Sequence, residues 1–208
     1  MVKLGKYIVI EGTDGTGKST QTQNIVQRVE QEGLEAIETN EPGGVAISQE
    51  LRRIIKDGSL ARSAFTNILL LSASRRETWL QQSEAALEAG KWIISSRDYT
   101  STLAYQGYGE DVDLDLIEYI TLLSTNEKYI NPDHRIILDL DDETERARRI
   151  TERGKLEKLD AFESRQNDFQ QKVIEGYREI AKTKGLPVIS ANQPIEVITQ
   201  QIWQIIWP

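Results

Sequence analysis

The stretch YIVIEGTDGTGKS, residues 7–19, decides the fold of this chain. Residues 12–19 match the pattern Gly-x-x-x-x-Gly-Lys-Ser in full, and an apolar segment, Tyr7–Glu11, stands directly before them. A helical pattern, Ser19–Gln31, follows. A glycine-rich turn between a buried strand and a helix brings backbone N–H groups together where they can bind phosphate oxygens. The stretch therefore predicts a loop that binds the phosphates of a nucleoside triphosphate.

Two side chains of this loop have a predicted chemical role. Lys18 is expected to neutralise the β- and γ-phosphates, and the Ser19 hydroxyl is expected to ligate Mg²⁺. The alternative is a glycine-rich turn that holds no ligand. Because the spacing, the Lys-Ser pair and both flanks agree with the pattern, we favour the phosphate site.

The composition limits the classes of protein that this chain can belong to. It has 208 residues, a net charge of -8, no cysteine and one histidine, His134. The length predicts a single α/β domain over residues 1–208, and the acidic balance argues against partners such as nucleic acid or a membrane. Without cysteines a disulfide framework is excluded, and one histidine disfavours a zinc site. The absence of a signal-like or transmembrane stretch predicts a cytoplasmic protein.

Five unbroken apolar runs alternate with helical patterns, which predicts an α/β fold with a five-stranded parallel sheet and helices on both faces. The expected strands are Tyr7–Glu11, Leu34–Thr39, Trp92–Ser96, Arg135–Leu140 and Pro187–Ala191. The expected helices are Ser19–Gln31, Ile47–Lys56, Phe65–Glu88, Leu114–Ser124, Glu143–Arg153, Gln166–Lys184 and Ile195–Trp207. We expect a polar loop at Gly107–Asp113 and a charged interruption at Gly154–Asp160.

A phosphate-binding loop alone does not define the reaction. The Asn-Lys-x-Asp string with which GTPases read guanine is absent. Asp139 ends an apolar strand, where ATPases often place an acid that activates water or binds Mg²⁺. We favour a structural role for Asp139, as a carboxylate near the start of the next helix.

Six further motifs follow the loop in a fixed order. They are Glu41-Pro42-Gly43-Gly44, Ser72–Glu77, Arg97 with Ser101–Gly107, Asp160–Glu163, Val173–Tyr177 and Asn192-Gln193-Pro194. Together they resemble the bacterial-type thymidylate kinase (dTMP kinase) family nearly from end to end. The resemblance implies a P-loop NTPase fold, transfer of the ATP γ-phosphoryl group to dTMP, and a homodimer packed through long helices. It also implies that Gly12, Thr13, Asp14, Gly15, Thr16, Gly17, Lys18, Ser19, Thr20, Arg149 and Arg153 bind ATP.

The resemblance also assigns roles toward the acceptor nucleotide. It implies that Asp14 binds the sugar 3′-OH, that Arg52 holds the acceptor phosphate and that Arg75 reads a pyrimidine carbonyl. Arg97 is expected between the donor and acceptor phosphates, and Tyr105 is expected to crowd the sugar 2′ position. The remaining expected acceptor contacts are Glu41, Leu71, Thr102 and Gln106. Ordinary packing is the alternative for Thr102, Tyr105 and Gln106, and Arg76 is expected to be structural.

A basic segment over about residues 149–160 is expected to form a short lid over ATP. It contains Arg149, Arg153, Lys155 and Lys158. Because phosphoryl transfer needs charge neutralisation in a dry site, and the variable positions of the phosphate loop contain no arginine, this lid should supply one. Arg153 is the best candidate, and with Lys18 and Arg97 it completes the expected catalytic set.

Several positions depart from the family pattern. Leu71 stands where a phenylalanine usually stacks on thymine, and Ser96 replaces an aspartate that helps to organise Mg²⁺ and Arg97. Asp98, two residues later, could take over that role if the strand continues. The other departures are Asn40, Thr151 and Ala161. Two alternatives to dTMP kinase activity therefore stay open: a kinase for another pyrimidine deoxynucleotide such as a 5-modified dUMP, and an ATP-binding regulatory protein with little kinase activity.

Overall fold

The fold places the carboxyl ends of five parallel strands around the phosphate loop, in a computed structural model that describes residues 5–154 and 167–207. The strands are β1 (Tyr7–Gly12), β2 (Ala36–Asn40), β3 (Trp92–Ser96), β4 (His134–Asp139) and β5 (Val188–Ser190). Their order in the sheet is β2-β3-β1-β4-β5, and every pairing is parallel. This confirms the predicted fold class, because parallel strands require crossover helices between them.

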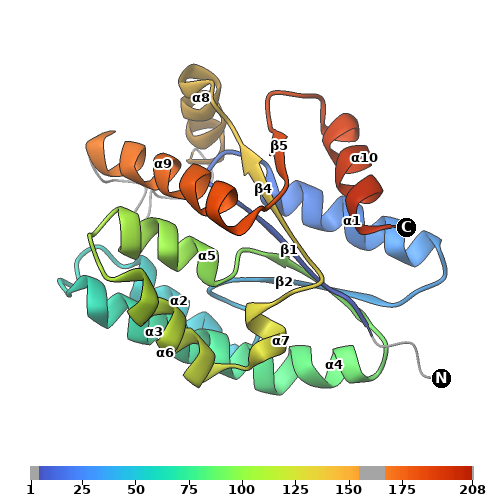
Figure 1. Cartoon of the computed structure of the whole chain (residues 1–208), viewed down its shortest axis with the longest axis horizontal. Coiled ribbons are helices and arrows are strands. Elements are labelled where there is room, and N and C mark those ends of the chain that lie inside the picture. The colour runs from blue at the N-terminus through green and yellow to red at the C-terminus, as the bar shows by residue number, and fades with distance from the viewer. Residues whose placement is uncertain (1–4, 155–166, 208) are drawn as a thin grey trace.

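Two helices cover one face of the sheet, α1 (Lys18–Gln31) and α10 (Ile195–Ile206) (Figure 1). The apolar residues Ile8 and Ile10 of β1 point to this face and pack with Ile25 of α1 and Ile202 of α10. All four side chains are fully buried. Because successive strand residues point to opposite faces, Tyr7 and Val9 must contribute to the other core.

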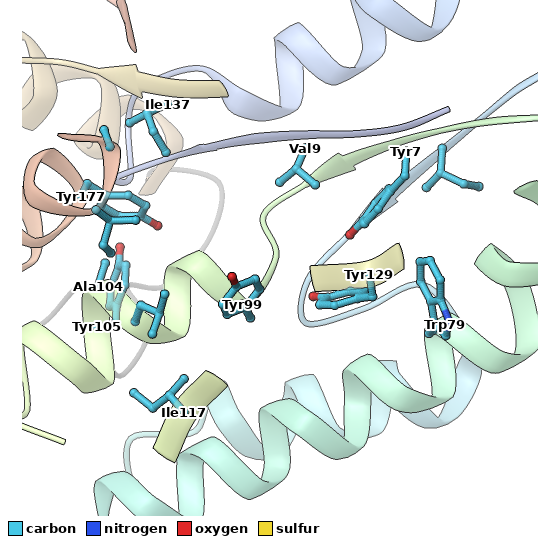
Figure 2. Close-up of a cluster of buried hydrophobic side chains, with 14 of the residues drawn as sticks. Tyr7, Val9, Trp79, Tyr99, Ala104, Tyr105, Ile117, Tyr129, Ile137 and Tyr177 are labelled. Atoms are coloured by element: carbon cyan, nitrogen blue, oxygen red, sulfur yellow. The ribbon is translucent and has the colours of Figure 1, made fainter. Parts of the chain in front are cut away.

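The other face is covered by a larger set of helical segments and contains an aromatic cluster (Figure 2). Tyr7, Trp79 and Tyr129 lie with ring centroids 5.4–5.8 Å apart. The segments are α3 (Ala64–Thr78), η1 (Trp79–Ser83), α4 (Glu84–Glu88), α5 (Tyr99–Thr102), η2 (Leu103–Tyr108), α6 (Leu114–Ser124), α7 (Glu127–Ile130) and α9 (Asn167–Lys184). Helix α2 (Ala46–Lys56) packs on α3, and α8 (Glu143–Gly154) lies beside the phosphate loop. None of the helices in these described ranges is long and apolar enough to span a membrane.

The structure corrects several expected boundaries. The strand expected at Leu34–Thr39 runs from Ala36 to Asn40, and the one expected at Pro187–Ala191 is only Val188–Ser190. These two are the edge strands and are partly exposed, so the expectation of cover on both faces holds only for the central strands. The long helix expected at Phe65–Glu88 is a continuous helical run with a π-helical segment, η1, inside it.

Three short helical segments were not expected from the sequence. They are α5, η2 and α7, and η2 takes two residues of the loop expected at Gly107–Asp113. Asp98 starts α5 because its side chain accepts a hydrogen bond from the Thr100 amide at 2.7 Å. An aspartate cap of this kind stabilises a helix too short to show a hydrophobic period.

Candidate active site

A cleft of about 730 Å³ opens at the carboxyl ends of β1, β2 and β3. Its walls carry residues from the phosphate loop, α2, α3 and α5, with Arg149 reaching in from α8. In open parallel sheets this edge is where ligands bind, and the volume suits a nucleotide-sized ligand. Three residues expected to contact the acceptor, Arg52, Arg75 and Gln106, lie in the same cleft as the phosphate loop.

The phosphate loop has the backbone geometry that anion binding requires. Gly15 and Gly17 have φ values of 86° and 87°, which a side chain would strain. Helix α1 begins directly afterwards, with no side-chain cap and no acidic residue in its first turn. Its first N–H groups and its positive dipole end therefore face the cleft. Lys18 donates to the Thr13 carbonyl oxygen at 2.7 Å, and Ser19 and Thr20 are exposed beside it.

Helix α8 brings Arg149 beside the phosphate loop. Its guanidinium donates to the carbonyl oxygens of Gly15 at 3.4 Å and Ala191 at 3.2 Å, and Glu145 accepts from its Nε at 2.7 Å. This position fits the expected ATP contact of Arg149. Arg153 lies near the end of α8, but its side chain is outside the described part of the structure. The same holds for Lys155, Lys158 and the Asp160–Glu163 motif, so the lid stays a prediction.

Arg97 lies in the cleft beside the phosphate loop. Its Nη2 forms an ion pair with Asp14 at 2.6 Å, and Asp14 also accepts a hydrogen bond from the Tyr105 hydroxyl at 3.1 Å. The Arg97 guanidinium lies over the Tyr105 ring, 5.6 Å from its centroid. Burial and the Asp14 charge raise the pKa of the Tyr105 hydroxyl, which stays a neutral donor. The structure thus brings together three residues that the sequence placed at one sugar and phosphate site.

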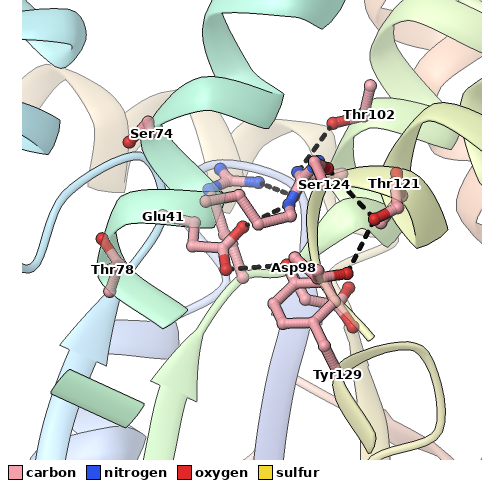
Figure 3. Close-up of polar contacts among 12 residues, drawn as sticks. Glu41, Ser74, Thr78, Asp98, Thr102, Thr121, Ser124 and Tyr129 are labelled. Atoms are coloured by element: carbon pink, nitrogen blue, oxygen red, sulfur yellow. Dashed lines mark hydrogen bonds and ion pairs between the residues drawn. The ribbon is translucent and has the colours of Figure 1, made fainter. Parts of the chain in front are cut away.

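Arg75 is buried at the other end of the cleft and forms an ion pair with Glu41. Figure 3 labels three residues of this polar group, Glu41, Thr102 and Tyr129. Its Nε donates to Glu41 at 3.0 Å and its Nη2 donates to the Thr102 hydroxyl at 3.1 Å. The Tyr129 hydroxyl donates to the second Glu41 oxygen at 2.7 Å. Burial raises the pKa of Glu41, and the Arg75 charge opposes that shift. Arg75 Nη1 is buried and has no hydrogen-bond partner among the described residues, so an acceptor from a ligand would satisfy it.

The remaining predicted acceptor residues line the same cleft. Arg52 of α2 is half-buried and donates to the Pro42 carbonyl oxygen at 2.7 Å. Leu71 is half-buried on the wall, and Gln106 is buried, with its amide donating to Glu110 at 3.1 Å. These three residues are therefore placed where an acceptor nucleotide could contact them.

Asp98 does not take the role proposed for it as a substitute at Ser96. Its carboxylate is buried and ion-paired with Arg135 at 2.6 Å, while Arg97 pairs with Asp14 instead. The reason is local: after Arg97 the chain leaves the strand direction, because Arg97 has a φ of 79°.

Asp139 and Arg76, for which the sequence predicted structural roles, both have partners within the fold. Asp139 forms an ion pair with Arg178 of α9 at 2.9 Å, so its carboxylate already has a partner. Arg76 is exposed and donates to the Ser124 carbonyl oxygen at 3.3 Å, while its neighbour Arg75 faces the cleft.

Three residues beside Arg97 were not selected from the sequence for any role in the site. Glu11, the last residue before the glycine loop, is fully buried and accepts hydrogen bonds from Ser101 and Tyr177. Burial raises the pKa of Glu11, and the nearby Asp98 adds to that shift. A charged residue at the end of an apolar strand was the available signal for Glu11. For Tyr177 the available signal was its place at the end of the Val173–Tyr177 motif, but a tyrosine in an amphipathic helix is ordinarily part of the core, so no role was assigned to it.

Known proteins resemble this chain over nearly its whole length. A family model described as thymidylate kinase matches residues 10–202. A protein named thymidylate kinase from Psychrobacter sp. (strain PRwf-1) is 34% identical over 98% of this chain and 97% of its own length. One of the same name from Prochlorococcus marinus (strain MIT 9515) is 40% identical over 95% and 94%. The crystal structure of thymidylate kinase from Ehrlichia chaffeensis is 25% identical, with a TM-score of 0.77, over 98% of this chain and 99% of that one.

Proposed function

Because this chain belongs to the thymidylate kinase family, we propose that it transfers the γ-phosphoryl group of ATP to dTMP, giving dTDP. The observation that carries the proposal is that the phosphate loop and the buried pair Arg75–Glu41 open into one cleft, with Arg97 between them. Donor phosphates at the loop and a base at Arg75 would then bring the acceptor phosphate toward Arg97. Such positioning is the main protein contribution to phosphoryl transfer.

On the donor side, the loop amides and Lys18 would bind the β- and γ-phosphates. The residues proposed to contact ATP are Gly12, Thr13, Asp14, Gly15, Thr16, Gly17, Lys18, Ser19, Thr20, Arg149 and Arg153. Lys18, Arg97 and Arg153 would neutralise the charge that is spread over the transferring group, without a covalent enzyme intermediate.

The donor set near the loop fits Mg²⁺ bound together with ATP. No group of three or more histidine, cysteine, aspartate or glutamate side chains in the described ranges could form a metal cage. An exposed hydroxyl, that of Ser19, lies at the start of α1. Mg²⁺ commonly binds through substrate phosphates, water and one or two protein oxygens, so Ser19 would hold it there. When bound, the ion neutralises phosphate charge.

On the acceptor side, we propose that Arg75 Nη1 donates to a carbonyl oxygen of thymine. This nitrogen is a buried donor on the cleft wall that lacks a hydrogen-bond partner among the described residues. Arg52 would hold the acceptor phosphate, and Asp14 would bind the 3′-OH after exchanging its contact with Arg97. Leu71, Thr102, Tyr105 and Gln106 would surround the base and sugar. Because the relatives above carry the name thymidylate kinase, dTMP is favoured over the 5-modified dUMP and regulatory alternatives.

We also propose that the protein is a homodimer. Neighbouring helical segments α3, η1 and α6 carry exposed apolar side chains, which we call the apolar helix face: Phe65, Leu69, Leu80, Leu116, Tyr119, Leu122 and Leu123. A contiguous group of exposed apolar side chains such as this is typical of an interface between proteins. In a symmetric dimer the apolar helix face of one copy would pack against the same face of the other copy, so both would be buried.

Measurement of ADP release with ATP and dTMP tests the proposed reaction. The purified protein should release ADP only when both nucleotides are present, and a product with the mass of dTDP should appear in equal amount. ATP hydrolysis that is independent of dTMP, with no dTDP formed, would contradict it.

A further inference from the structure

Beside Arg97 lies a buried polar cluster to which the proposed transfer reaction assigns no role. It consists of Glu11 at the end of β1, Ser101 in α5 and Tyr177 in α9. Glu11 and Tyr177 are nearly inaccessible to solvent, at 0% and 3% exposure. Burying a carboxylate is costly unless it is well hydrogen-bonded. The presence of a carboxylate and two hydroxyls in one buried cluster therefore calls for a structural or functional explanation.

Donors surround both carboxylate oxygens of Glu11. Oε1 accepts from the amides of Asp98 at 2.8 Å and Ser101 at 3.1 Å. Oε2 accepts from the Tyr177 hydroxyl at 2.9 Å and from the Ser101 hydroxyl, also at 2.9 Å. The two hydroxyls lie 2.8 Å from each other, so both face the same side of the carboxylate.

The same two hydroxyls reach Arg97. Its Nη1 donates to Ser101 Oγ at 2.9 Å and to the Tyr177 hydroxyl oxygen at 3.2 Å, and it also contacts the Gly12 carbonyl oxygen at 3.3 Å. Its Nη2 instead pairs with Asp14 in the cleft. The guanidinium therefore has one anchored nitrogen and one nitrogen directed to the site of reaction.

We propose that Tyr177, together with Ser101, is a positioning residue that fixes Arg97 for phosphoryl transfer by linking its Nη1 to the buried carboxylate of Glu11. The Tyr177 hydroxyl donates its proton to Glu11 and accepts from Arg97. Nη1 is thus linked to the Glu11 carboxylate through two hydroxyls and not by a direct ion pair, while Nη2, now paired with Asp14, can exchange that carboxylate for a phosphate oxygen. This inference rests on the proposed transfer reaction.

The ring of Tyr177 is held independently of its hydroxyl. It lies edge-on to Tyr105, with centroids 6.4 Å apart and planes at 85° (Figure 2). Arg97 also needs external support, because its φ of 79° is costly for a residue with a side chain. Removing only the hydroxyl should therefore loosen the guanidinium while leaving the packing intact.

A double-mutant cycle tests the proposal on the full-length protein. Tyr177→Phe should lower kcat about tenfold, because an Arg97 that is less fixed loses stabilisation mainly in the transition state, while the KM values for ATP and dTMP change less than about twofold. In an Arg97→Lys background, the same substitution should change kcat less than twofold. Tyr108→Phe is the matched control. Tyr108 packs against Gly176 of α9, the helix that carries Tyr177, and no hydrogen bond of the Tyr108 hydroxyl is found in the described structure. The kcat of this variant should therefore stay unchanged.

An unchanged kcat in Tyr177→Phe, or a tenfold loss that persists in the Arg97→Lys background, would overturn the proposal. Turnover of dTMP by the unmodified protein establishes the reaction separately, so failure of the inference and failure of the proposed function are distinguishable. If Tyr177→Phe melts more than about 10 °C below the unmodified protein, Ser101→Ala takes its place in the cycle with the same expected result.

Discussion

Lys18 is buried at the start of α1 with its ammonium group 2.7 Å from the Thr13 carbonyl oxygen, so it is already directed over the loop. Lys18→Ala should lower kcat by at least about 100- to 1000-fold, since it removes the charge nearest to the transferring phosphates. The assay is ADP release at saturating ATP and dTMP. Lys182→Ala, an exposed lysine on α9, is the control and should keep full activity. Substantial remaining activity in Lys18→Ala would reject the proposed mechanism.

A comparison of variants at the neighbouring residues Arg52 and Arg53 distinguishes a substrate contact from a general effect of surface charge. Arg52 lines the cleft, whereas the side chain of Arg53 is 71% exposed and pairs with Glu50. Arg52→Ala should raise the KM for dTMP about tenfold or more with a smaller effect on kcat, because that contact forms before the transition state. Arg53→Ala should leave both constants unchanged. Equal KM values for the two variants would remove Arg52 from the acceptor site.

Leu71 is the position where the base pocket departs most clearly from the family pattern. Leu71→Phe restores a ring on the cleft wall, and an offset-stacked aromatic pair adds about 0.5–1.5 kcal/mol. The KM for dTMP should therefore fall about 2- to 10-fold, while the KM for ATP stays constant. A KM for dTMP that rises would mean that the wall has no room for a ring.

Within the site, the sequence predicted positions better than partners. The loop motif and the order of the later motifs located Asp14, Arg75, Arg97 and Tyr105, and the structure brings all four to one cleft. The sequence did not predict that Arg97 pairs with Asp14, because that contact joins residues 83 positions apart. It placed Asp98 wrongly, since a single positive φ at Arg97 reverses the alternation on which the expectation depended.

At the scale of elements, Asp98 links a helix start to a buried ion pair. Asp98 and Asp113 both cap a helix through their side chains, but only Asp98 is buried and paired with Arg135. Asp113→Ala should cost about 1 kcal/mol in the free energy of unfolding. Asp98→Ala should cost about 3–5 kcal/mol, because it leaves a buried guanidinium without its charge partner. Urea unfolding measures both, and equal losses would contradict the assignment of Asp98 to structure.

The long and central elements were predictable, and the short ones were not. β3 was predicted with its observed ends, since its five residues are buried and begin with the apolar run Trp92–Ile94. α5, η2 and α7 have four to six residues each, too few for a helical period to appear. The π-helical segment η1 leaves no sequence signal, because one extra residue per turn changes spacing rather than composition.

At the scale of the molecule, the apolar helix face predicts self-association. Leu123 on α6 is 63% exposed, which is unfavourable for a large apolar side chain in a monomer. Leu123→Glu should convert a dimer to a monomer in analytical ultracentrifugation, because two buried carboxylates would meet across the interface. Val197→Glu, at an exposed position of α10, should leave the dimer intact. A monomeric unmodified protein would contradict the dimer.

A comparison of acceptor nucleotides tests most directly whether the protein phosphorylates dTMP in this cleft. ADP release should be measured with ATP and each of dTMP, dUMP, 5-hydroxymethyl-dUMP, dCMP and dGMP. The highest kcat/KM is expected for dTMP, with little turnover of dGMP, whose larger base would have to fit between Arg75 and Leu71. A higher kcat/KM for another acceptor, or no ADP release with any of the five, would contradict the claim.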